Sequence, residues 1–241
     1  MLKQFEVQNI YIGEYVPPYL CFTANTAGST VQLTKWNSPT AVTLETSTDL
    51  ENWTTYTIWD TITLSNIWDK LYWRNTSETD TWFSTSGNVY YYFVMTWSIS
   101  GSWDVNYLLN KNSTTSVSSN CFARLFDWCT ALTTPPKLPA TTLALYCYRN
   151  MFAWCTSLET LPSLPATTLA DYCYWYIFYQ CSKIKLSTTQ TGEYQTPYRI
   201  PKSWTWTTGT QSLTGMFEDT WWTFTSDPTI NTTYYTSNTV V

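Results

Sequence analysis

The sequence predicts a mainly β protein, in which an N-terminal β-sandwich is followed by a solenoid of short repeats and a degenerate C-terminal cap. Three observations lead to this prediction. Thr and Tyr are abundant whereas Ala, Glu and Lys are scarce, a bias typical of strands and turns. The first half of the chain carries short alternating runs between turn clusters. The second half repeats itself at a fixed interval along the chain.

The N-terminal part, residues 1–111, is expected to fold as a β-sandwich, because short alternating runs at regular spacing are typical of that architecture. Within the expected strand Val89–Met95, the run Tyr90–Phe93 is too continuous for a one-sided strand, so we expect it to be central. The junction with the second part is expected within 106–118, where Leu108 and Leu109 close the sandwich. The other expected strands are Thr30–Thr34, Ala41–Glu45, Thr54–Ile58, Thr61–Leu64 and Lys70–Arg74.

Paired cysteines mark the repeat in residues 112–241. Cys121, Cys147 and Cys173 are equally spaced, with a period of 26, and each is followed eight positions later by a second cysteine. The segment Leu-Pro-Ala-Thr-Thr-Leu-Ala also occurs twice, at 138–144 and 164–170. This period lies within the roughly 20–29 residues of leucine-rich repeats, which favours a short leucine-rich-repeat (α/β) solenoid. Its units are 121–146, 147–172 and 173–194.

Each repeat is expected to supply one short strand, followed by one or two helical turns on the opposite side. The segments 132–138 and 158–164 alternate and contain proline, which favours short, edge-like strands. Since one unit cannot cover its own apolar face, equivalent residues should stack, and Phe126, Phe152 and Phe178 should form one buried column. Leu213–Phe217 is a last, degenerate copy and is expected to cap the stack.

The paired cysteines allow three interpretations from spacing alone. A spacing of eight matches no zinc pattern and histidine is absent, which argues against a metal site. Disulfides between neighbouring repeats are allowed but not required. A ladder of small buried hydrophobic side chains is the simplest alternative, because free cysteine fills that role well. Cys21, alone in the N-terminal part, is expected in its core. The six repeat cysteines are Cys121, Cys129, Cys147, Cys155, Cys173 and Cys181.

The repeat unit resembles that of BspA-like leucine-rich-repeat surface proteins. The resemblance is strongest over 114–184, where the pattern Cys-Tyr-x-x-Met-Phe-x-x-Cys-Thr-Ser-Leu recurs before Leu-Pro-Ala-Thr-Thr-Leu-Ala. The tail 230–241 and the preceding β module, with its segments 43–49 and 61–65, are similar to those of the family more loosely. This resemblance implies a non-catalytic protein that is displayed on a cell or a virion and acts in adhesion or recognition. No binding residue carries over, because the shared motif residues are structural.

Composition and motifs argue against several classes of function. Only 12% of the residues are charged, the net charge is −5, and no run of Lys or Arg suggests nucleic acid or an anionic membrane as partner. The longest apolar run, Val89–Met95, is far shorter than the roughly 18 residues of a membrane span. The chain lacks histidine, a Gly-rich phosphate loop and a Gly-x-Ser-x-Gly motif. We therefore expect no enzyme activity, catalytic residue, cofactor or metal.

The leading prediction is a surface recognition or adhesion protein that binds a protein or glycan on another cell or surface. It is expected to be extracellular or surface-displayed, although the first residues show no signal peptide. A phage virion attachment or decoration protein is the alternative. A carbohydrate-binding module is a further one, and would need exposed, coplanar aromatic rings. Tyr148 and Tyr174, at equivalent positions of adjacent repeats, are the candidate ligand-binding pair, with packing as their competing role.

The balance of tryptophan and glycine is unusual. The chain has 15 Trp and 7 Gly, whereas an average composition of roughly 7% glycine would give about 17. Most of these tryptophans occupy turn-like contexts in which glycine is ordinary, while Trp53, Trp73 and Trp175 fit strands or aromatic runs. Replacing the other twelve by glycine gives 19 Gly and 3 Trp. Those twelve are Trp36, Trp59, Trp68, Trp82, Trp97, Trp103, Trp128, Trp154, Trp204, Trp206, Trp221 and Trp222.

The hypothesis that follows is a difference in the genetic code. The source organism would read the codon UGA as glycine, whereas this sequence reads it as tryptophan. A genuine aromatic surface that stacks on sugar rings is a competing interpretation, and unexplained drift of composition is another. Under the recoding hypothesis, these tryptophans carry no information about function.

Overall fold

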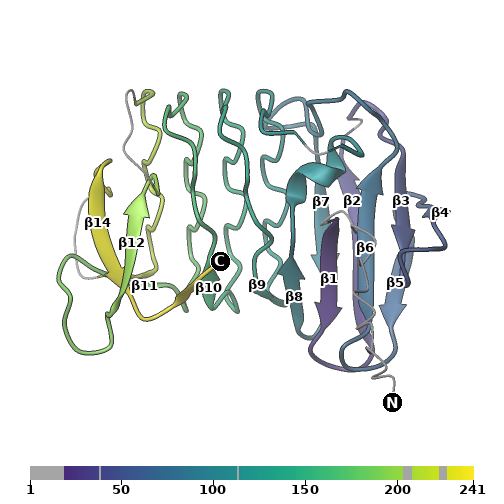
Figure 1. The fold of residues 1–241 in the computed structure, drawn as a ribbon, viewed down its shortest axis with the longest axis horizontal. Helices are drawn as coiled ribbons and strands as arrows, with labels where there is room; N and C mark the ends of the chain where they lie inside the picture. The colour runs from purple at the N-terminus through teal and green to yellow at the C-terminus, as the bar shows by residue number, and fades with distance from the viewer. Residues whose placement is uncertain (1–18, 38, 113, 203–207, 223–226) are drawn as a thin grey trace, which may run out of the picture.

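The computed structural model describes residues 19–37, 39–112, 114–202, 208–222 and 227–241, and these residues form a mainly β structure (Figure 1). They contain no α-helix, and none of their segments is a helix suited to crossing a membrane. The only helical element among them is the short 3-10 segment η1. The elements are β1 Leu20–Ala24, β2 Ser29–Trp36, β3 Leu44–Ser47, β4 Thr54–Thr55, β5 Thr61–Leu64, β6 Lys70–Asn75, β7 Tyr90–Met95, β8 Ile99–Ser102, η1 Val105–Leu108, β9 Leu132–Thr134, β10 Thr160–Leu161, β11 Lys185–Ser187, β12 Thr196–Ile200, β13 Trp221–Trp222, β14 Thr232–Thr236 and β15 Thr239–Val240.

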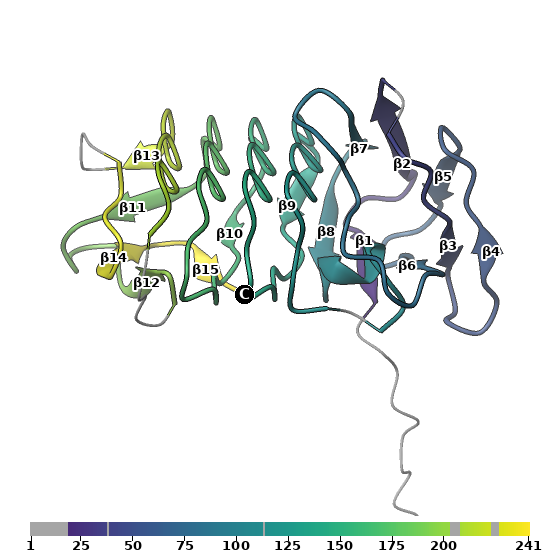
Figure 2. The same ribbon diagram turned by 90° about the horizontal axis from the view of Figure 1, so that it is seen from above.

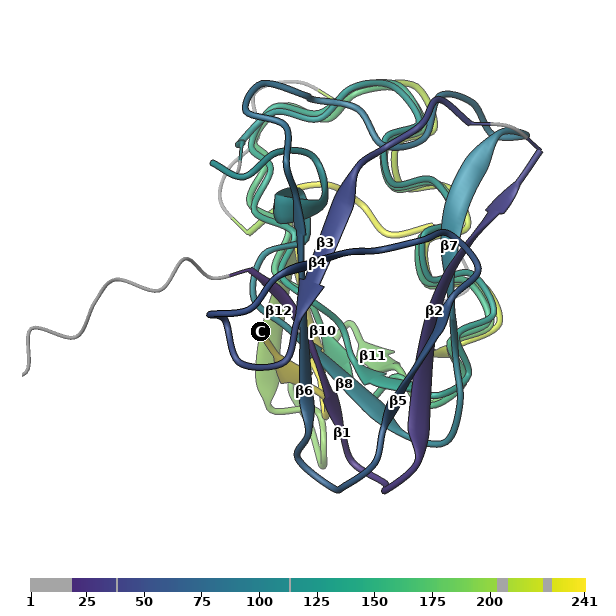
Figure 3. The same cartoon turned by 90° about the vertical axis from the view of Figure 1, so that its right-hand side faces the viewer.

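Two sheets pack face to face in the N-terminal part (Figure 3). One has the strand order β4-β3-β6-β1-β8-β9, and the other has the order β5-β2-β7. Aromatic side chains fill the space between them: the ring of Phe93 lies 5.0 Å from that of Phe22 and 5.2 Å from that of Trp73. All three are buried. Cys21 is also buried, but on the opposite face of β1, outside the hydrophobic cluster that contains these rings.

The alternating runs mark most of these strands correctly. Thr61–Leu64 coincides with β5, and the expected strands at 30–34 and 70–74 lie within β2 and β6. The sequence pattern misses β1 and β8, whose residues do not alternate clearly. Both are inner strands of the six-stranded sheet, and in β1 burial on both faces removes the alternation. β8 alternates in burial, but its four residues include only one apolar side chain, Ile99.

The prediction that Val89–Met95 forms a central strand is wrong. β7 is at the end of the three-stranded sheet, and its side chains alternate between buried and more exposed positions. The run looks continuous because its outward positions carry Tyr90 and Tyr92, which are half-buried rather than polar. Their rings lie 5.8 Å apart, and the guanidinium of Arg124 lies over the ring of Tyr90. Aromatic residues on the outer face thus conceal the alternation.

The repeats stack side by side, as their constant period predicts (Figures 1 and 2). The ring of Phe152 lies 5.4 Å from that of Phe126 and 5.8 Å from that of Phe178, and all three are fully buried. Phe217 continues the column at 5.4 Å, so the degenerate last copy occupies the expected place. At the other end Phe93 of β7 stacks on Phe126 at 5.3 Å. One apolar column therefore runs from the N-terminal sheets to the last copy.

The prediction of helical turns in each repeat is wrong. The segments that begin at Cys121, Cys147 and Cys173 form consecutive turns. In the first of them, the amide of Phe122 donates to the carbonyl of Cys147 in the next repeat, at 2.9 Å. The amide of Leu125 instead donates back to the carbonyl of Phe122, at 3.2 Å. Alternate amides are thus used between repeats, which leaves no continuous i to i−4 ladder of the kind that an α-helix requires.

The stack continues directly from the N-terminal sheets. β8 pairs in parallel with β9, and the amide of Phe93 donates to the carbonyl of Leu125 at 2.8 Å. Leu108 and Leu109 are buried in the same hydrophobic cluster as the repeats. The expected boundary at residue 111 stays a prediction, but the core does not divide there.

The cysteines form two buried ladders of free thiols. In the second ladder each Sγ donates to the carbonyl of a phenylalanine one level earlier: Cys155 to Phe126 and Cys181 to Phe152, both at 3.0 Å. Cys129 makes the same bond to Phe93, at 2.9 Å. The described residues contain no group of three or more potential metal ligands. The small-hydrophobe interpretation of the cysteines is therefore the one that agrees with the structure.

We expect these thiols to react only when the chain unfolds. Burial raises the pKa of Cys147 to about 12 and raises the pKa of Cys155 well above its ordinary value, so the thiolate, which is the reactive form, is rare at neutral pH. Titration with a chromogenic disulfide reagent at pH 8 should detect no fast-reacting cysteine in the native protein and all 7 after denaturation in guanidinium. Several fast-reacting thiols in the native state would contradict the buried ladders.

Candidate functional site

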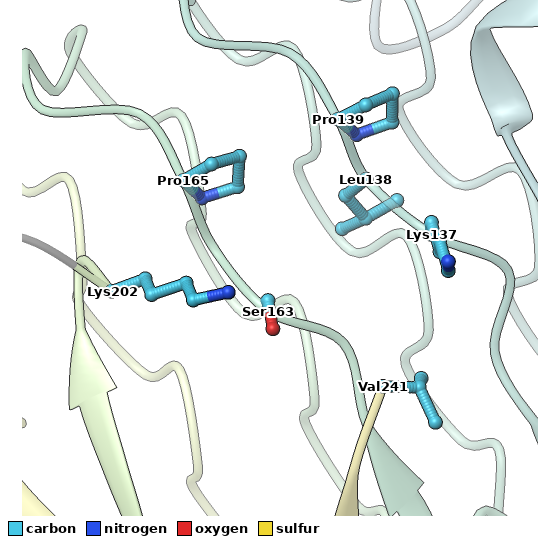
Figure 4. A pocket seen from close by; sticks show the side chains of 7 residues that line it. All are labelled: Lys137, Leu138, Pro139, Ser163, Pro165, Lys202 and Val241. Atoms are coloured by element: carbon cyan, nitrogen blue, oxygen red, sulfur yellow. The ribbon is translucent and has the colours of Figure 1, made fainter.

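The candidate site is a groove between the ends of the first two repeats and the C-terminal strands (Figure 4). It consists of two adjoining hollows of about 230 and 310 Å³ that share Ser163 and Lys202. Pockets for drug-sized ligands measure roughly 300–1,000 Å³, so the two hollows lie below and at the lower end of this range, and each suits a single side chain or one sugar ring. The first hollow is lined by Lys137, Leu138, Pro139, Ser163, Pro165, Lys202 and Val241.

Backbone contacts hold the walls of this groove in place. The amide of Ser163 donates to the carbonyl of Val241 at 2.7 Å, and β15 pairs in parallel with β10. On the opposite wall, the amide of Lys202 donates to the carbonyl of Leu164 at 2.7 Å. The proline-containing segments 135–139 and 162–165 restrict the backbone between these contacts. The groove is therefore preformed.

Two exposed lysines give the groove its charge. In Figure 4 the side chain of Lys202 extends toward Ser163, and Lys137 lies on the far side of Leu138. Neither belongs to an ion pair in the part of the chain that the structure describes. The ammonium of Lys137 lies 5.7 Å from the ring centre of Trp103. Arg199 borders the second hollow, where its guanidinium donates to Asn231 Oδ1 at 2.8 Å.

The apolar floor of the groove is rigid. Leu138 and Tyr198 are buried, and the hydroxyl of Tyr198 donates to the carbonyl of Pro162 at 3.0 Å. Pro139 and Pro165 are half-buried at the rim. The lining of neither hollow of the groove includes an Asp or Glu side chain. The groove thus combines positive charge with a hydroxyl and an apolar surface, a combination suited to a ligand that carries a carboxylate.

A separate pocket, of about 490 Å³, lies away from the groove, between Tyr19, Arg74 and Asn112. Its charges are compensated. Arg74 forms an ion pair of 2.8 Å with Glu45, and its guanidinium lies 3.9 Å from the ring centre of Trp53. Lys111 is paired with Glu78 in the same way. This separate pocket therefore attracts anions less strongly than the groove at Lys137 and Lys202.

The structure corrects the choice of Tyr148 and Tyr174 as ligand-binding residues. Both side chains are fully buried, and their rings stack on each other at 5.8 Å. Phe122 continues this column at 6.0 Å from Tyr148. Their separation by one repeat period makes them neighbours in the stack, and because they are buried no ligand reaches their faces. They are packing residues.

The sequence contains only a weak signal for the groove. Lys137 follows the first strand of the repeats, but its counterpart one period later is Ser163. Lys202 follows the repeats and belongs to no motif. These residues meet only because the C-terminal strands fold back along the stack, which no local pattern indicates.

Comparison with known proteins adds no relative. No family model, no curated protein and no solved structure matches the chain.

Proposed function

We propose that this protein is a non-catalytic recognition protein whose basic groove binds an anionic group of a protein or glycan on another surface. In this proposal an N-terminal β-sandwich carries a short repeat solenoid related to the leucine-rich-repeat surface proteins. The protein would act outside the cell, or displayed on a cell or virion.

One observation carries the proposal: Lys137 and Lys202 face an open groove whose described lining contains no Asp or Glu, and neither forms an ion pair among the described residues. The chain as a whole has a net charge of −5, so such a site is not explained by a general excess of positive charge. Stacked repeats form extended rigid surfaces that commonly bind other molecules. Small hollows that combine a cation, a hydroxyl and apolar walls favour recognition of one acidic residue or one acidic sugar.

Replacing both groove lysines by alanine is expected to weaken binding to acidic probes by about tenfold or more. The physical reason is that two charge contacts of roughly 1 kcal/mol each disappear, and about 1.4 kcal/mol corresponds to a factor of ten. Binding of wild type and the Lys137→Ala/Lys202→Ala variant would be measured on immobilised polygalacturonate, poly-glutamate and a neutral glucan. Wild type should bind at least one acidic probe, less strongly at high salt, and should not bind the neutral one.

The matched control is Lys183→Ala/Lys185→Ala, which removes the same charge from lysines paired with Glu159 and Glu193. This control should leave binding within about twofold, since exposed Lys183 and half-buried Lys185 both lie outside the groove lining. Equal loss in both double variants, or no binding of wild type to either acidic probe, would refute the proposed site.

A further inference from the structure

Six tryptophans adopt a backbone conformation that favours glycine. The φ angles are 82° at Trp59, 73° at Trp68, 64° at Trp97, 61° at Trp103, 65° at Trp128 and 62° at Trp154. Residues with a Cβ are strained in this left-handed region by roughly 1–2 kcal/mol, and bulky residues rarely occupy it. All six belong to the twelve positions at which sequence context already favours glycine.

The turns at Trp59 and Trp68 show the requirement most clearly. The amide of Asp60 donates to the carbonyl of Thr57 at 3.0 Å, which makes Trp59 the third residue of a four-residue turn. The amide of Asp69 closes an equivalent turn around Trp68. A type II turn needs a clearly positive φ at this third position, and glycine is the residue that usually supplies it.

A third turn of the same kind contains glycine at that position. The amide of Ser29 donates to the carbonyl of Thr26 at 3.3 Å, and the third residue is Gly28, with a φ of 78°. The last repeat copy gives a second parallel: the amide of Met216 donates to the carbonyl of Leu213, and the third residue is Gly215, with a φ of 62°. This chain thus places glycine where the two turns above place tryptophan.

The repeats alone would not decide the matter. Tyr172, Tyr176 and Gln180 also have positive φ, so the turns of the stack accept other residues there. In the N-terminal part, fewer types of residue occupy positions with a positive φ. Among its described residues, six that are not glycine have a positive φ, and four of these are tryptophan.

The side chains of these four tryptophans are largely exposed and make few contacts. The exposed fraction is 54% for Trp59, 73% for Trp68, 73% for Trp97 and 48% for Trp103. Within the described part of the chain, the one ring contact of these four side chains is that of Trp103 with the ammonium of Lys137, at 5.7 Å. The indole N–H that donates a hydrogen bond there is that of Trp53, which is not among the four. Trp59 and Trp68 flank opposite ends of β5, and Trp97 and Trp103 flank opposite ends of β8. They therefore do not form one flat surface of the kind that sugar rings require.

The three tryptophans that fit strands or aromatic runs behave differently, since none of them has a positive φ. Trp73 is fully buried. The indole of Trp53 donates to the carbonyl of Leu50 at 3.0 Å. Trp175 packs under Arg149, whose guanidinium lies 4.6 Å from its ring centre. Two populations of tryptophan thus coexist in one chain, and they differ in backbone conformation: six have a positive φ, and these three do not.

We propose that the native protein carries glycine at Trp59, Trp68, Trp97, Trp103, Trp128 and Trp154, because its source reads the codon UGA as glycine. UGA differs from the glycine codon GGA only at its first base, and many translations assign it to tryptophan. The backbone angles restrict the assignment to these six of the twelve suspected positions. Trp36, Trp82 and Trp221 have no positive φ, Trp222 belongs to strand β13, and Trp204 and Trp206 lie outside the described residues.

The test is peptide mass spectrometry of the protein purified from the organism that encodes it, together with its gene sequence. We expect UGA codons and glycine masses at the six positions, and UGG codons and tryptophan masses at Trp53 and Trp73, which serve as internal controls within the same digest. Tryptophan masses at Trp59 and Trp68 would overturn the proposal, as would UGG codons there.

Discussion

Replacing Phe152 by alanine is expected to lower the free energy of unfolding by about 3–5 kcal/mol. Phe152 is fully buried between the rings of Phe126 and Phe178, at 5.4 and 5.8 Å. Neighbours on both sides belong to rigid turns that are hydrogen-bonded between repeats, so the resulting cavity cannot easily collapse. The backbone carbonyl of Phe152 also accepts a hydrogen bond from the thiol of Cys181, which links the phenylalanine column to the second cysteine ladder. Denaturant unfolding followed by far-UV circular dichroism measures the loss.

The matched control for this prediction is Leu145→Ala in the same repeat region. Leu145 is apolar but exposed at 41%, so its replacement should change the free energy of unfolding by no more than about 0.5 kcal/mol. A loss of less than about 1 kcal/mol in Phe152→Ala would contradict a tightly packed, continuous column. Equal losses in the two variants would contradict it as well.

A recombinant chain with glycine in place of Trp59, Trp68, Trp97 and Trp103 is expected to be more stable than the chain with tryptophan, by about 2–4 kcal/mol in total. Relief of the left-handed strain contributes roughly 1–2 kcal/mol at each position. The greater freedom of glycine in the unfolded chain offsets about 0.4–1 kcal/mol of this. The four positions are in separate turns, so their effects should be close to additive. Chemical denaturation of both proteins under identical conditions measures the difference.

Trp128 and Trp154 are left out of that variant for a physical reason. Their rings stack at 4.4 Å, and an aromatic pair of this kind stabilises by roughly 0.5–1.5 kcal/mol, which cancels much of the gain from relieved strain. Their replacement by glycine should therefore change stability little.

Two substitutions serve as controls for the glycine variant. Trp36→Gly, at an exposed strand position without positive φ, should lower stability by about 0.5–1 kcal/mol. Trp73→Gly should lower it by about 3–5 kcal/mol, because Trp73 fills the space between the two sheets. Destabilisation of the fourfold variant would argue that its four tryptophans are native.

Parts of the candidate site were beyond sequence-based prediction. Tyr148 and Tyr174 recur at the period of the repeat, which predicts that their rings are neighbours but not that their column is buried. The sequence does not predict that Lys137 and Lys202 meet, because they share no motif and come from different parts of the chain. Charge at a groove depends on which loops meet there, and local patterns do not contain that information.

The sequence by itself determined the mainly β character, the period of the stack and the buried column of Phe126, Phe152 and Phe178. A fixed period places equivalent residues in register, so Phe126, Phe152 and Phe178 must meet whatever backbone joins them. Only the tertiary structure decided that the connecting segments are turns rather than helices, since their amides bond to the neighbouring repeat instead of along their own segment. It alone also decided where the C-terminal strands fold back, and therefore where Lys202 faces Ser163 across an open groove. Hydrogen bonds and contacts between distant segments select among local conformations that the sequence leaves close in energy.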